Sequence, residues 1–414
     1  MILNPIFVLG GFVLQAWAVP TALQGNAPAN SPSMSIPAVA SSSTAEAKVQ
    51  LENLAKIALD VARQNIASPD TRQKHGACTS KNVQVRRDWR AFSSSEKKSF
   101  IHAVLCLQRK PARTPSELAS GAKTRYDDFV ATHINQTGQV HYSGTFLSWH
   151  RYLIFHFDQA LRNECGYTGD YPYWDWGADT DAMEKSPIFD GSDTSMSGNG
   201  VYIANQPDCQ LPLIGFATIP LVTGSGGGCV TSGPFKNYTL NLGPADLILP
   251  GGNKSSAANP LDYNPRCLKR DLTTALLRQF ANYTAIVQTI LQNDDIFDFE
   301  IGVQGVPGSG SIGVHGAGHY SMGGDPSRDG YVSPGDPAFW QHHGMIDRVW
   351  WIWQHLNLPR RQGVVAGTGT FLNHPPSAEV TLDTVINLGY ANGEPIALRD
   401  VMSTTAGPFC YVYV

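Results

Sequence analysis

The chain has 414 residues, of which 42% are apolar, 10% are aromatic and only 15% are charged, with a formal net charge of −4. This composition excludes disorder over the whole length. The lack of a basic excess argues against a nucleic-acid or anionic-membrane partner.

The first residues have the pattern of a secretion signal. An apolar run over residues 6–14 leads to Ala16-Trp17-Ala18, a small-residue cleavage pattern. The run is too short to span a bilayer. It has no Lys or Arg before it, so a buried first helix is the alternative. We expect a signal peptide at residues 1–18, then a disordered linker or pro-segment at residues 19–44 that is rich in Ser, Pro, Ala and Asn. The protein is then secreted and extracellular.

Two further features fit export. Four Asn-x-Ser/Thr sequons are candidate glycosylation sites: Asn135, Asn237, Asn253 and Asn282. Seven cysteines are scattered without a C-x-x-C pair. In an oxidising compartment they predict up to three disulfides with one cysteine left over, and the pairing is open.

Beyond the linker, helical spacing of apolar residues dominates the chain. It predicts helices over residues 45–66, 94–107, 126–134, 149–161, 271–292, 312–320 and 336–356. Residues 191–265 are rich in Gly, Ser and Pro, and the tail from Ile386 has short strand-like runs. The fold class is therefore mainly α, wrapped by long loops and a few short strands, with one catalytic domain over residues 45–414.

The downstream histidines form a candidate metal site. His315 and His319 lie four residues apart, so a helix places both rings on one face. His342 and His343 are about 100° apart on a helix and cannot easily serve the same ion. One of them would complete a three-histidine site. Asp347, one turn beyond His343, is placed to accept the second N–H of a ligand ring.

A second trio lies upstream, at His133, His141 and His150. Ligation by imidazole alone suits copper or zinc and not calcium or magnesium, and the lack of a cysteine ligand argues against a blue-copper site. No Glu stands beside His315, as a zinc-protease helix would require. A structural or hydrolytic zinc site stays an alternative.

Two segments carry a specific resemblance: HYSGTFLSWHR at residues 141–151 and DPAFWQHHGMID at residues 336–347. They resemble the copper signatures of type 3 copper proteins, in particular the short secreted fungal tyrosinases and catechol oxidases (polyphenol oxidases). The resemblance covers roughly residues 78–414. It implies a four-helix bundle that holds two copper ions, with His342 a neighbour and not a ligand. The implied ligands are His133, His141 and His150 for one ion, and His315, His319 and His343 for the other.

The resemblance also implies which residues control activity. The family's buried "water-keeper" Glu aligns with Gln304, with Glu300 as the competing position. Gly316 replaces a polar residue, often Asn, and Tyr320 follows the second downstream histidine. Hydroxylating a monophenol needs a base to deprotonate it. Because Gln304 is uncharged and Gly316 has no amide, we expect o-diphenol oxidation to o-quinones, with O2 reduced to water.

Access to the copper pair is assigned to Gly330, at a position where relatives carry a blocking residue, and to Phe339. The segment Tyr411-Val-Tyr413 is similar to the motif that closes the catalytic domain in relatives, so a C-terminal shielding domain is not expected. The partners are then O2 and small phenols. A tyrosinase with monophenol hydroxylase or o-aminophenol oxidase activity is the alternative, and a hemocyanin-like O2-binding protein is a remote one.

Overall fold

The computed structural model describes residues 43–67, 78–212 and 218–414. These described residues all fall within one unit, Val39–Val414. The expected signal peptide and all but the last two residues of the expected linker lie outside the described ranges. Among the described residues, no helix is both long and apolar enough to cross a membrane.

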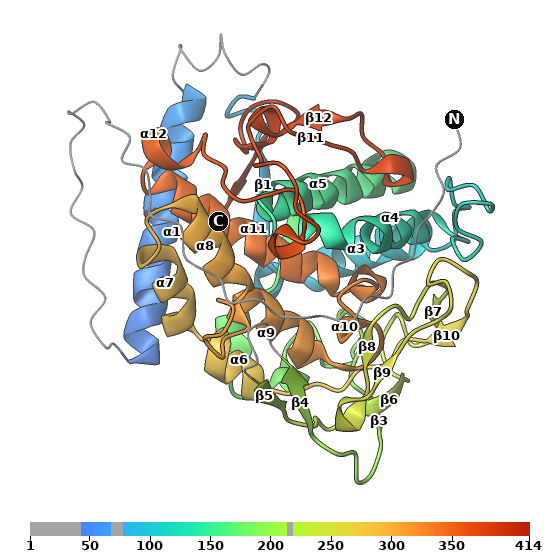
Figure 1. Ribbon diagram of the computed structural model, residues 1–414. Helices are drawn as coiled ribbons and strands as arrows, with labels where there is room; N and C mark the ends of the chain where they lie inside the picture. Colours follow the sequence, from blue (N-terminus) through green and yellow to red (C-terminus); the bar gives the residue numbers. More distant parts are fainter. Residues whose placement is uncertain (1–42, 68–77, 213–217) are drawn as a thin grey trace. The chain divides into compact units, whose positions relative to one another are not determined.

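Helices dominate the described chain, which confirms the expected mainly α fold (Figure 1). They are α1 (Thr44–Ala67), α3 (Ser94–Leu107), α4 (Arg125–Val140), α5 (Phe146–Cys165), α6 (Ala275–Phe280), α7 (Tyr283–Leu291), α8 (Ile296–Gln304), α9 (Gly313–Met322), α10 (Gly324–Ser327), α11 (Phe339–His355) and α12 (Leu358–Arg361).

The strands are short and scattered among long loops. They are β1 (Gln84–Asp88), β2 (Tyr171–Tyr173), β3 (Gly200–Tyr202), β4 (Cys209–Pro212), β5 (Thr218–Leu221), β6 (Gly227–Val230), β7 (Thr239–Leu240), β8 (Leu247–Ile248), β9 (Lys254–Ser255), β10 (Arg266–Cys267), β11 (Val385–Ile386), β12 (Ile396–Ala397) and β13 (Tyr411–Tyr413). One parallel sheet has the order β13-β1-β2, with Val85 opposite Val412 and Arg87 opposite Pro172. The other described sheets have two antiparallel strands each.

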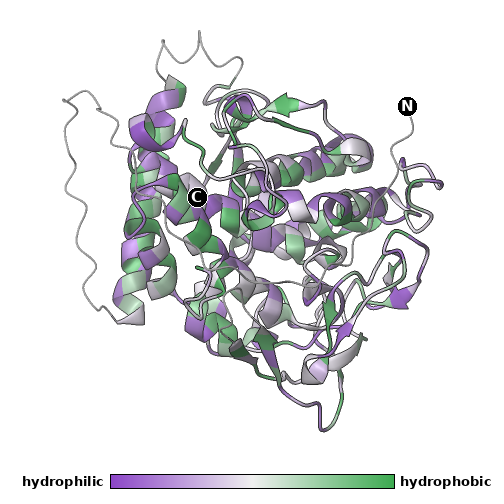
Figure 2. Ribbon diagram, in the orientation of Figure 1, coloured by the Kyte–Doolittle hydropathy of each residue, from purple (hydrophilic) through white to green (hydrophobic). Residues whose placement is uncertain are grey.

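Local sequence signals account for several helix ends. The side chain of Ser93 accepts from the backbone N–H of Glu96, whose carboxylate accepts from the Ser93 N–H, so a capping box opens the helix α3. Apolar residues at helical spacing, among them Leu51, Leu54 and Ala58, form the buried face of α1 against α7 and α11. Figure 2 shows the resulting mixture of hydrophobic and hydrophilic residues along α1.

Two helix predictions need correction. The single helix expected over residues 271–292 is broken into α6 and α7, because Ala281 leaves helical geometry and the Asn282 side chain caps α7 by accepting from the Ala285 N–H at 2.9 Å. Between the helices expected over residues 271–292 and 312–320, where no helix was predicted, lies α8, which Asp295 caps by accepting from the Asp298 N–H.

Four helices carry the predicted ligands: α4, α5, α9 and α11. Helix α5 packs against α4 and α11, and α11 also packs against α9. In Figure 1, α11 runs between α1 and α5 and contacts both. This arrangement is the helical bundle that the resemblance implies.

Asp347, near the middle of α11, is the centre of a buried charge cluster. Its Oδ1 lies 2.6 Å from Nε of Arg151 on α5, and its Oδ2 lies 3.0 Å from Nη1 of Arg86 on β1. The hydroxyls of Tyr411 and Tyr413 on β13 donate to Oδ2 at 2.7 and 2.5 Å. Although burial opposes ionisation, Arg151 and Arg86 hold the pKa of Asp347 below its usual value.

The expectation that Asp347 accepts a ligand ring's N–H is therefore wrong. Both of its oxygens are occupied by the arginines and tyrosines, while Nδ1 of His343 has no hydrogen-bond partner in the structure. Asp347 instead ties α11, α5 and the three-stranded sheet together.

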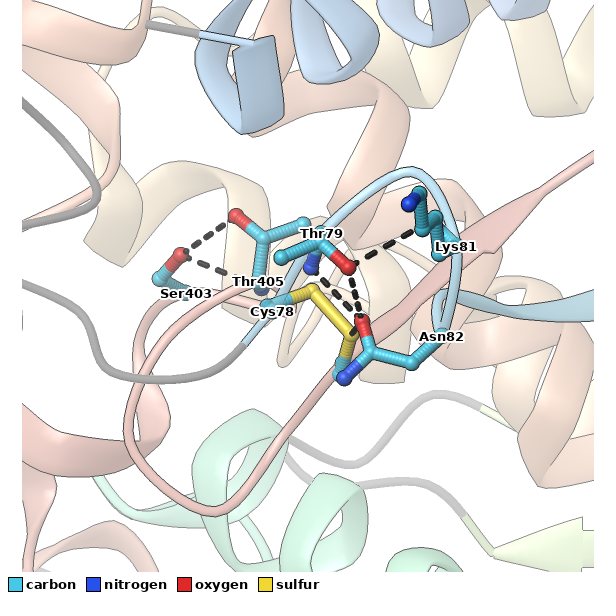
Figure 3. The surroundings of a disulfide bond; sticks show 7 residues. Cys78, Thr79, Lys81, Asn82, Ser403 and Thr405 are labelled. Atoms are coloured by element: carbon cyan, nitrogen blue, oxygen red, sulfur yellow. Dashed lines mark hydrogen bonds between the residues drawn. A yellow bond between two sulfur atoms is a disulfide. The ribbon is translucent and has the colours of Figure 1, made fainter. Parts of the chain in front are cut away.

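The disulfides confirm the expected three pairs with one cysteine left over: Cys78–Cys410, Cys106–Cys165, Cys229–Cys267, and free, buried Cys209. Cys78–Cys410 fastens the segment before β1 to the residue before β13, beside a turn in which Asn82 accepts from the Thr79 N–H at 2.7 Å (Figure 3).

Replacing Asp347 by Ala leaves two buried guanidinium groups without a carboxylate. We expect the free energy of unfolding to fall by about 3–5 kcal/mol, measured by urea titration with the disulfides intact. Asp383→Ala, which removes an ion pair with Arg399 at the surface, serves as the control and should change it by less than about 1 kcal/mol. Equal losses of unfolding free energy in the two variants would show that the buried cluster stabilises the fold no more than a surface ion pair does.

Candidate metal centre

The upstream trio is a compact, buried cluster. His133 on α4, His141 at the end of α4 and His150 on α5 place their ligand atoms within 4.8 Å of one another. Each Nδ1 lies within hydrogen-bond distance of a backbone carbonyl: His133 with Tyr331 at 2.8 Å, His141 with Thr137 at 3.0 Å, and His150 with Phe146 at 2.8 Å. A carbonyl only accepts, so Nδ1 carries the hydrogen and Nε2 presents its lone pair. Nε2 of His133 and of His150 has no other partner.

The downstream cluster contains four histidines. His315 and His319 come from α9, and His342 and His343 from α11. Nε2 of His319 lies 3.2 Å from Nε2 of His315 and 3.2 Å from Nε2 of His343. Two imidazole nitrogens that share one tetrahedral ion at about 2.0–2.1 Å are about 3.3 Å apart. The sequence separated His342 from His343 on the helix, yet the structure places both in this cluster.

Burial keeps these imidazoles neutral. It lowers the pKa of His133 to about 3 and that of His141 to about 4, and it lowers the pKa of His315, His319 and His343 well below the usual value. A neutral imidazole is the form that binds a metal ion. The unpartnered Nε2 atoms, the spacing and the protonation state therefore all fit a metal ion in each cluster.

The two clusters face each other. The rings of His150 and His343 stack with centroids 4.6 Å apart, and those of His141 and His315 are 5.8 Å apart. Phe339 stacks on His343 at 4.1 Å. Its side chain is 0% exposed, so the expectation that Phe339 lines the substrate entrance is wrong. It supports the imidazoles from within the core.

Gln304 is engaged with the chain next to a predicted ligand. Its Oε1 accepts from the backbone N–H of Tyr142 at 2.7 Å, and its backbone carbonyl accepts from the Tyr142 hydroxyl at 2.7 Å. Its Nε2 reaches the carbonyl of Glu300 at 3.4 Å. Tyr142 follows His141 and has a φ of +46°, an uncommon conformation for a bulky residue. Gln304 thus holds the backbone that positions His141.

Glu300 is the buried carboxyl beside the site. Its Oε1 accepts from the backbone N–H of Leu147 at 3.2 Å, in the first turn of α5, where Thr145 makes no side-chain cap. Burial raises the pKa of Glu300 to about 8. Glu300, the alternative to Gln304 in the resemblance, is therefore a helix-capping acid close to Phe146. The ring of Phe146 lies 4.9 Å from those of His150 and His315.

The remaining predicted positions surround the clusters. Gly316 is buried, and a Cβ there would lie 2.9 Å from Cβ of Ile312. Gly330 is exposed, and a Cβ there would meet nothing within 4 Å. It precedes Tyr331, whose carbonyl holds His133. Tyr320 is half-buried on α9, and burial raises its pKa.

The sequons differ in accessibility. Asn135, Asn237 and Asn253 are exposed. Asn282 is partly buried, and its amide both caps α7 and donates to the carbonyl of Arg278 at 2.7 Å.

These observations define a class of protein: a helical protein with two facing all-histidine clusters, each able to hold one metal ion. The family profile described as the common central domain of tyrosinase matches residues 123–356, more than half of the chain. The chain belongs to the tyrosinase family, which implies a dinuclear copper site that uses O2 and phenolic substrates.

Individual relatives agree with this assignment. The chain is 42% identical to tyrosinase P of Aspergillus terreus over 330 residues, which cover 80% of this chain and 91% of that protein. It is 37% identical to N-acetyl-6-hydroxytryptophan oxidase of Emericella nidulans over 373 residues, covering 87% and 99%. The solved structure of a mutant polyphenol oxidase from Thermothelomyces thermophila matches with a TM-score of 0.81 at 40% identity, covering 88% and 97%.

The raised pKa of Glu300 predicts a pH dependence. Its folded-state pKa, about 8, lies above the ordinary 4.5, so its contribution to stability is present below about pH 4.5 and is lost as the pH rises towards 8. Glu300→Gln keeps an oxygen for the Leu147 N–H and cannot ionise. Between pH 5 and pH 8 the unfolding free energy of the metal-free wild type should fall by a few kcal/mol relative to the variant, measured by urea titration. Parallel pH profiles would contradict the burial argument.

Proposed function

We propose that the protein is a copper-dependent catechol oxidase that converts o-diphenols into o-quinones and reduces O2 to water. His133, His141 and His150 would hold one copper ion, and His315, His319 and His343 the other. The observation that carries the proposal is the pair of facing, neutral, all-imidazole clusters, in which no carboxylate or thiolate of the described chain joins the histidines. Copper is favoured over the zinc alternative because the chain belongs to the tyrosinase family.

Bound copper supplies one-electron redox chemistry at each cluster, so the pair together accepts the two electrons that an o-diphenol gives up. The chain's own residues prepare that centre. Carbonyl acceptors orient the imidazoles, and Phe339 and Phe146 exclude water beneath them. Gly330 is exposed and directly precedes the residue whose carbonyl holds His133, so we place substrate access there.

Diphenol oxidation is favoured over monophenol hydroxylation because no side chain at the two control positions is free to act as a base. Gly316 has no side chain, and the amide of Gln304 is already bound to Tyr142 and Glu300. The observation that favours the alternative, a tyrosinase with monophenol hydroxylase activity, is the buried carboxyl of Glu300. The name of the relative from Emericella nidulans, N-acetyl-6-hydroxytryptophan oxidase, also makes hydroxyindoles candidate substrates.

We also propose that the protein is secreted and glycosylated. The three disulfides support an oxidising compartment. Asn237 and Asn253, exposed in loops between short strands, are the best-placed acceptors.

The function is tested by O2 uptake of the copper-loaded protein with catechol and then with tyramine. We expect rapid uptake with catechol and little with tyramine. Comparable rates with both would establish a tyrosinase and point to Glu300 as the base. No uptake with either, in protein confirmed to hold two copper ions, would favour the hemocyanin-like alternative.

Adding an amide at position 316 tests the control position directly. Gly316→Asn should raise the ratio of tyramine to catechol turnover several-fold, because the amide can order a water for phenol deprotonation. Gly316→Ala is the matched control, since it carries the same crowded Cβ against Ile312 without the amide. Equal tyramine-to-catechol ratios in the two variants would show that residue 316 does not control monophenol hydroxylation.

Filling the open position at residue 330 tests access. Gly330→Phe has room for its Cβ, so we expect unchanged thermal stability. The ratio of the KM for a bulky catechol to the KM for catechol itself should be several-fold higher in Gly330→Phe than in the wild type. Gly330→Ala serves as the control and should behave like the wild type. An unchanged KM ratio in Gly330→Phe would show that substrates enter elsewhere.

A further inference from the structure

The downstream cluster has one imidazole more than a copper site of this kind needs. His342 lies with its ring centroid 4.4 Å from that of His319 and 5.1 Å from that of His343. Its ligand atom is within 4.8 Å of those of the other three histidines. Proximity alone therefore does not decide which three of the four imidazoles bind the ion.

A hydrogen bond from outside the cluster decides it. Nε1 of Trp176 donates to Nδ1 of His342 at 3.1 Å, and both side chains are fully buried. An indole N–H can only donate, so Nδ1 of His342 is unprotonated and its lone pair is used. The hydrogen of the neutral ring must then be on Nε2. Neither nitrogen of His342 has a free lone pair, whichever of them lies nearer the ion.

The ring of His342 is also fixed in place. A Cβ at Gly318 would lie 2.2 Å from its Cε1 and 2.3 Å from its Nδ1. The imidazole thus lies directly against the backbone of α9, in space that only a glycine leaves open. Because Gly318 precedes His319, His342 packs behind the ligand pair on α9.

Trp176 is held rigidly enough to act in this way. It begins a short 3-10 helix, Trp176–Asp179, and the ring of Tyr283 lies so close to Gly177 that a Cβ there would be 2.5 Å from it. The Tyr283 hydroxyl donates to Asp175 at 2.8 Å. The backbone N–H of Trp174 donates to the carbonyl of Gln341 at 3.0 Å, which holds this segment in register with His342.

We propose that Trp176 is a positioning residue that keeps His342 out of the coordination sphere, so that the downstream copper has three imidazole ligands and an open position. Catalytic metal sites keep such a position for the substrate or the oxidant. The inference rests on the proposed copper pair, but the tautomer of His342 that underlies it does not depend on that pair.

Losing the indole N–H should release His342. In Trp176→Phe, Nδ1 of His342 has no donor facing it, so the hydrogen can move to Nδ1 and Nε2 can present a lone pair. The downstream ion then gains a fourth imidazole, and the average number of imidazoles per copper rises above three.

The tautomer is tested by ¹⁵N–¹H correlation NMR of histidine-labelled, full-length protein loaded with diamagnetic copper(I). The His342 signal is assigned by its loss in His342→Leu. We expect wild-type His342 to show an unprotonated Nδ1 and a protonated Nε2. A wild-type ring with its hydrogen on Nδ1 overturns the proposal, whether or not copper catalysis is found.

The coordination is tested by copper K-edge absorption of the reduced protein, which reports the number of imidazoles per copper. We expect three in the wild type and more than three in Trp176→Phe. The number should return to three in the double variant Trp176→Phe/His342→Leu. Three imidazoles in Trp176→Phe, in protein that keeps two copper ions, overturn the proposal.

A matched control separates the hydrogen bond from loss of a buried indole. Trp174 is equally buried, and its ring centroid lies 6.2 Å from that of His342, but its Nε1 donates to Asp179 at 2.6 Å. Trp174→Phe should leave the His342 tautomer and the imidazole count unchanged. A rise in the count in this variant would contradict a specific role for Trp176.

Discussion

The buried ion pair between Asp347 and Arg151 sets the spacing of the metal centre. Arg151 follows His150 on α5, and Asp347 lies one turn after His343 on α11. The pair therefore joins the two helices next to the two rings that stack at 4.6 Å across the centre. Arg86 forms a second ion pair with Asp347, and the hydroxyls of Tyr411 and Tyr413 donate to the same carboxylate. These contacts join the carboxylate to the three-stranded sheet. A charge cluster of this kind is costly to bury and more costly to break, which favours one fixed distance between α5 and α11.

Around that fixed spacing, the orientation of each ring is set locally. The carbonyls of Thr137 and Phe146 lie four residues before His141 and His150, so the helices supply the acceptors themselves. His133 instead uses the carbonyl of Tyr331, which belongs to the loop before α11. The same principle extends to the imidazole that is excluded, since His342 receives an N–H where the ligands of the upstream trio donate one. Hydrogen-bond polarity, and not distance alone, separates ligands from neighbours.

Much of this could be predicted from the sequence, because the deciding signals are local. The i, i+4 spacing of His315 and His319, the capping box at Ser93 and the two long signatures each lie within a short continuous stretch of the chain. What could not be predicted depends on contacts between distant segments. Arg86 lies 261 residues before Asp347 in the sequence and Tyr413 lies 66 residues after it, so the role expected for that carboxylate was wrong. Phe339 was expected at the entrance because a sequence motif does not show how deeply a side chain is buried. Trp176 belongs to no recognised motif, so its contact with His342 could not be predicted.

Anomalous diffraction at the copper edge, from crystals of the copper-loaded protein, would show whether each trio holds one copper ion. We expect two peaks per chain, one bounded by Nε2 of His133, His141 and His150 and the other by Nε2 of His315, His319 and His343, with His342 outside both. A single peak, or a peak bound by His342 in place of one of the three downstream ligands, would contradict it.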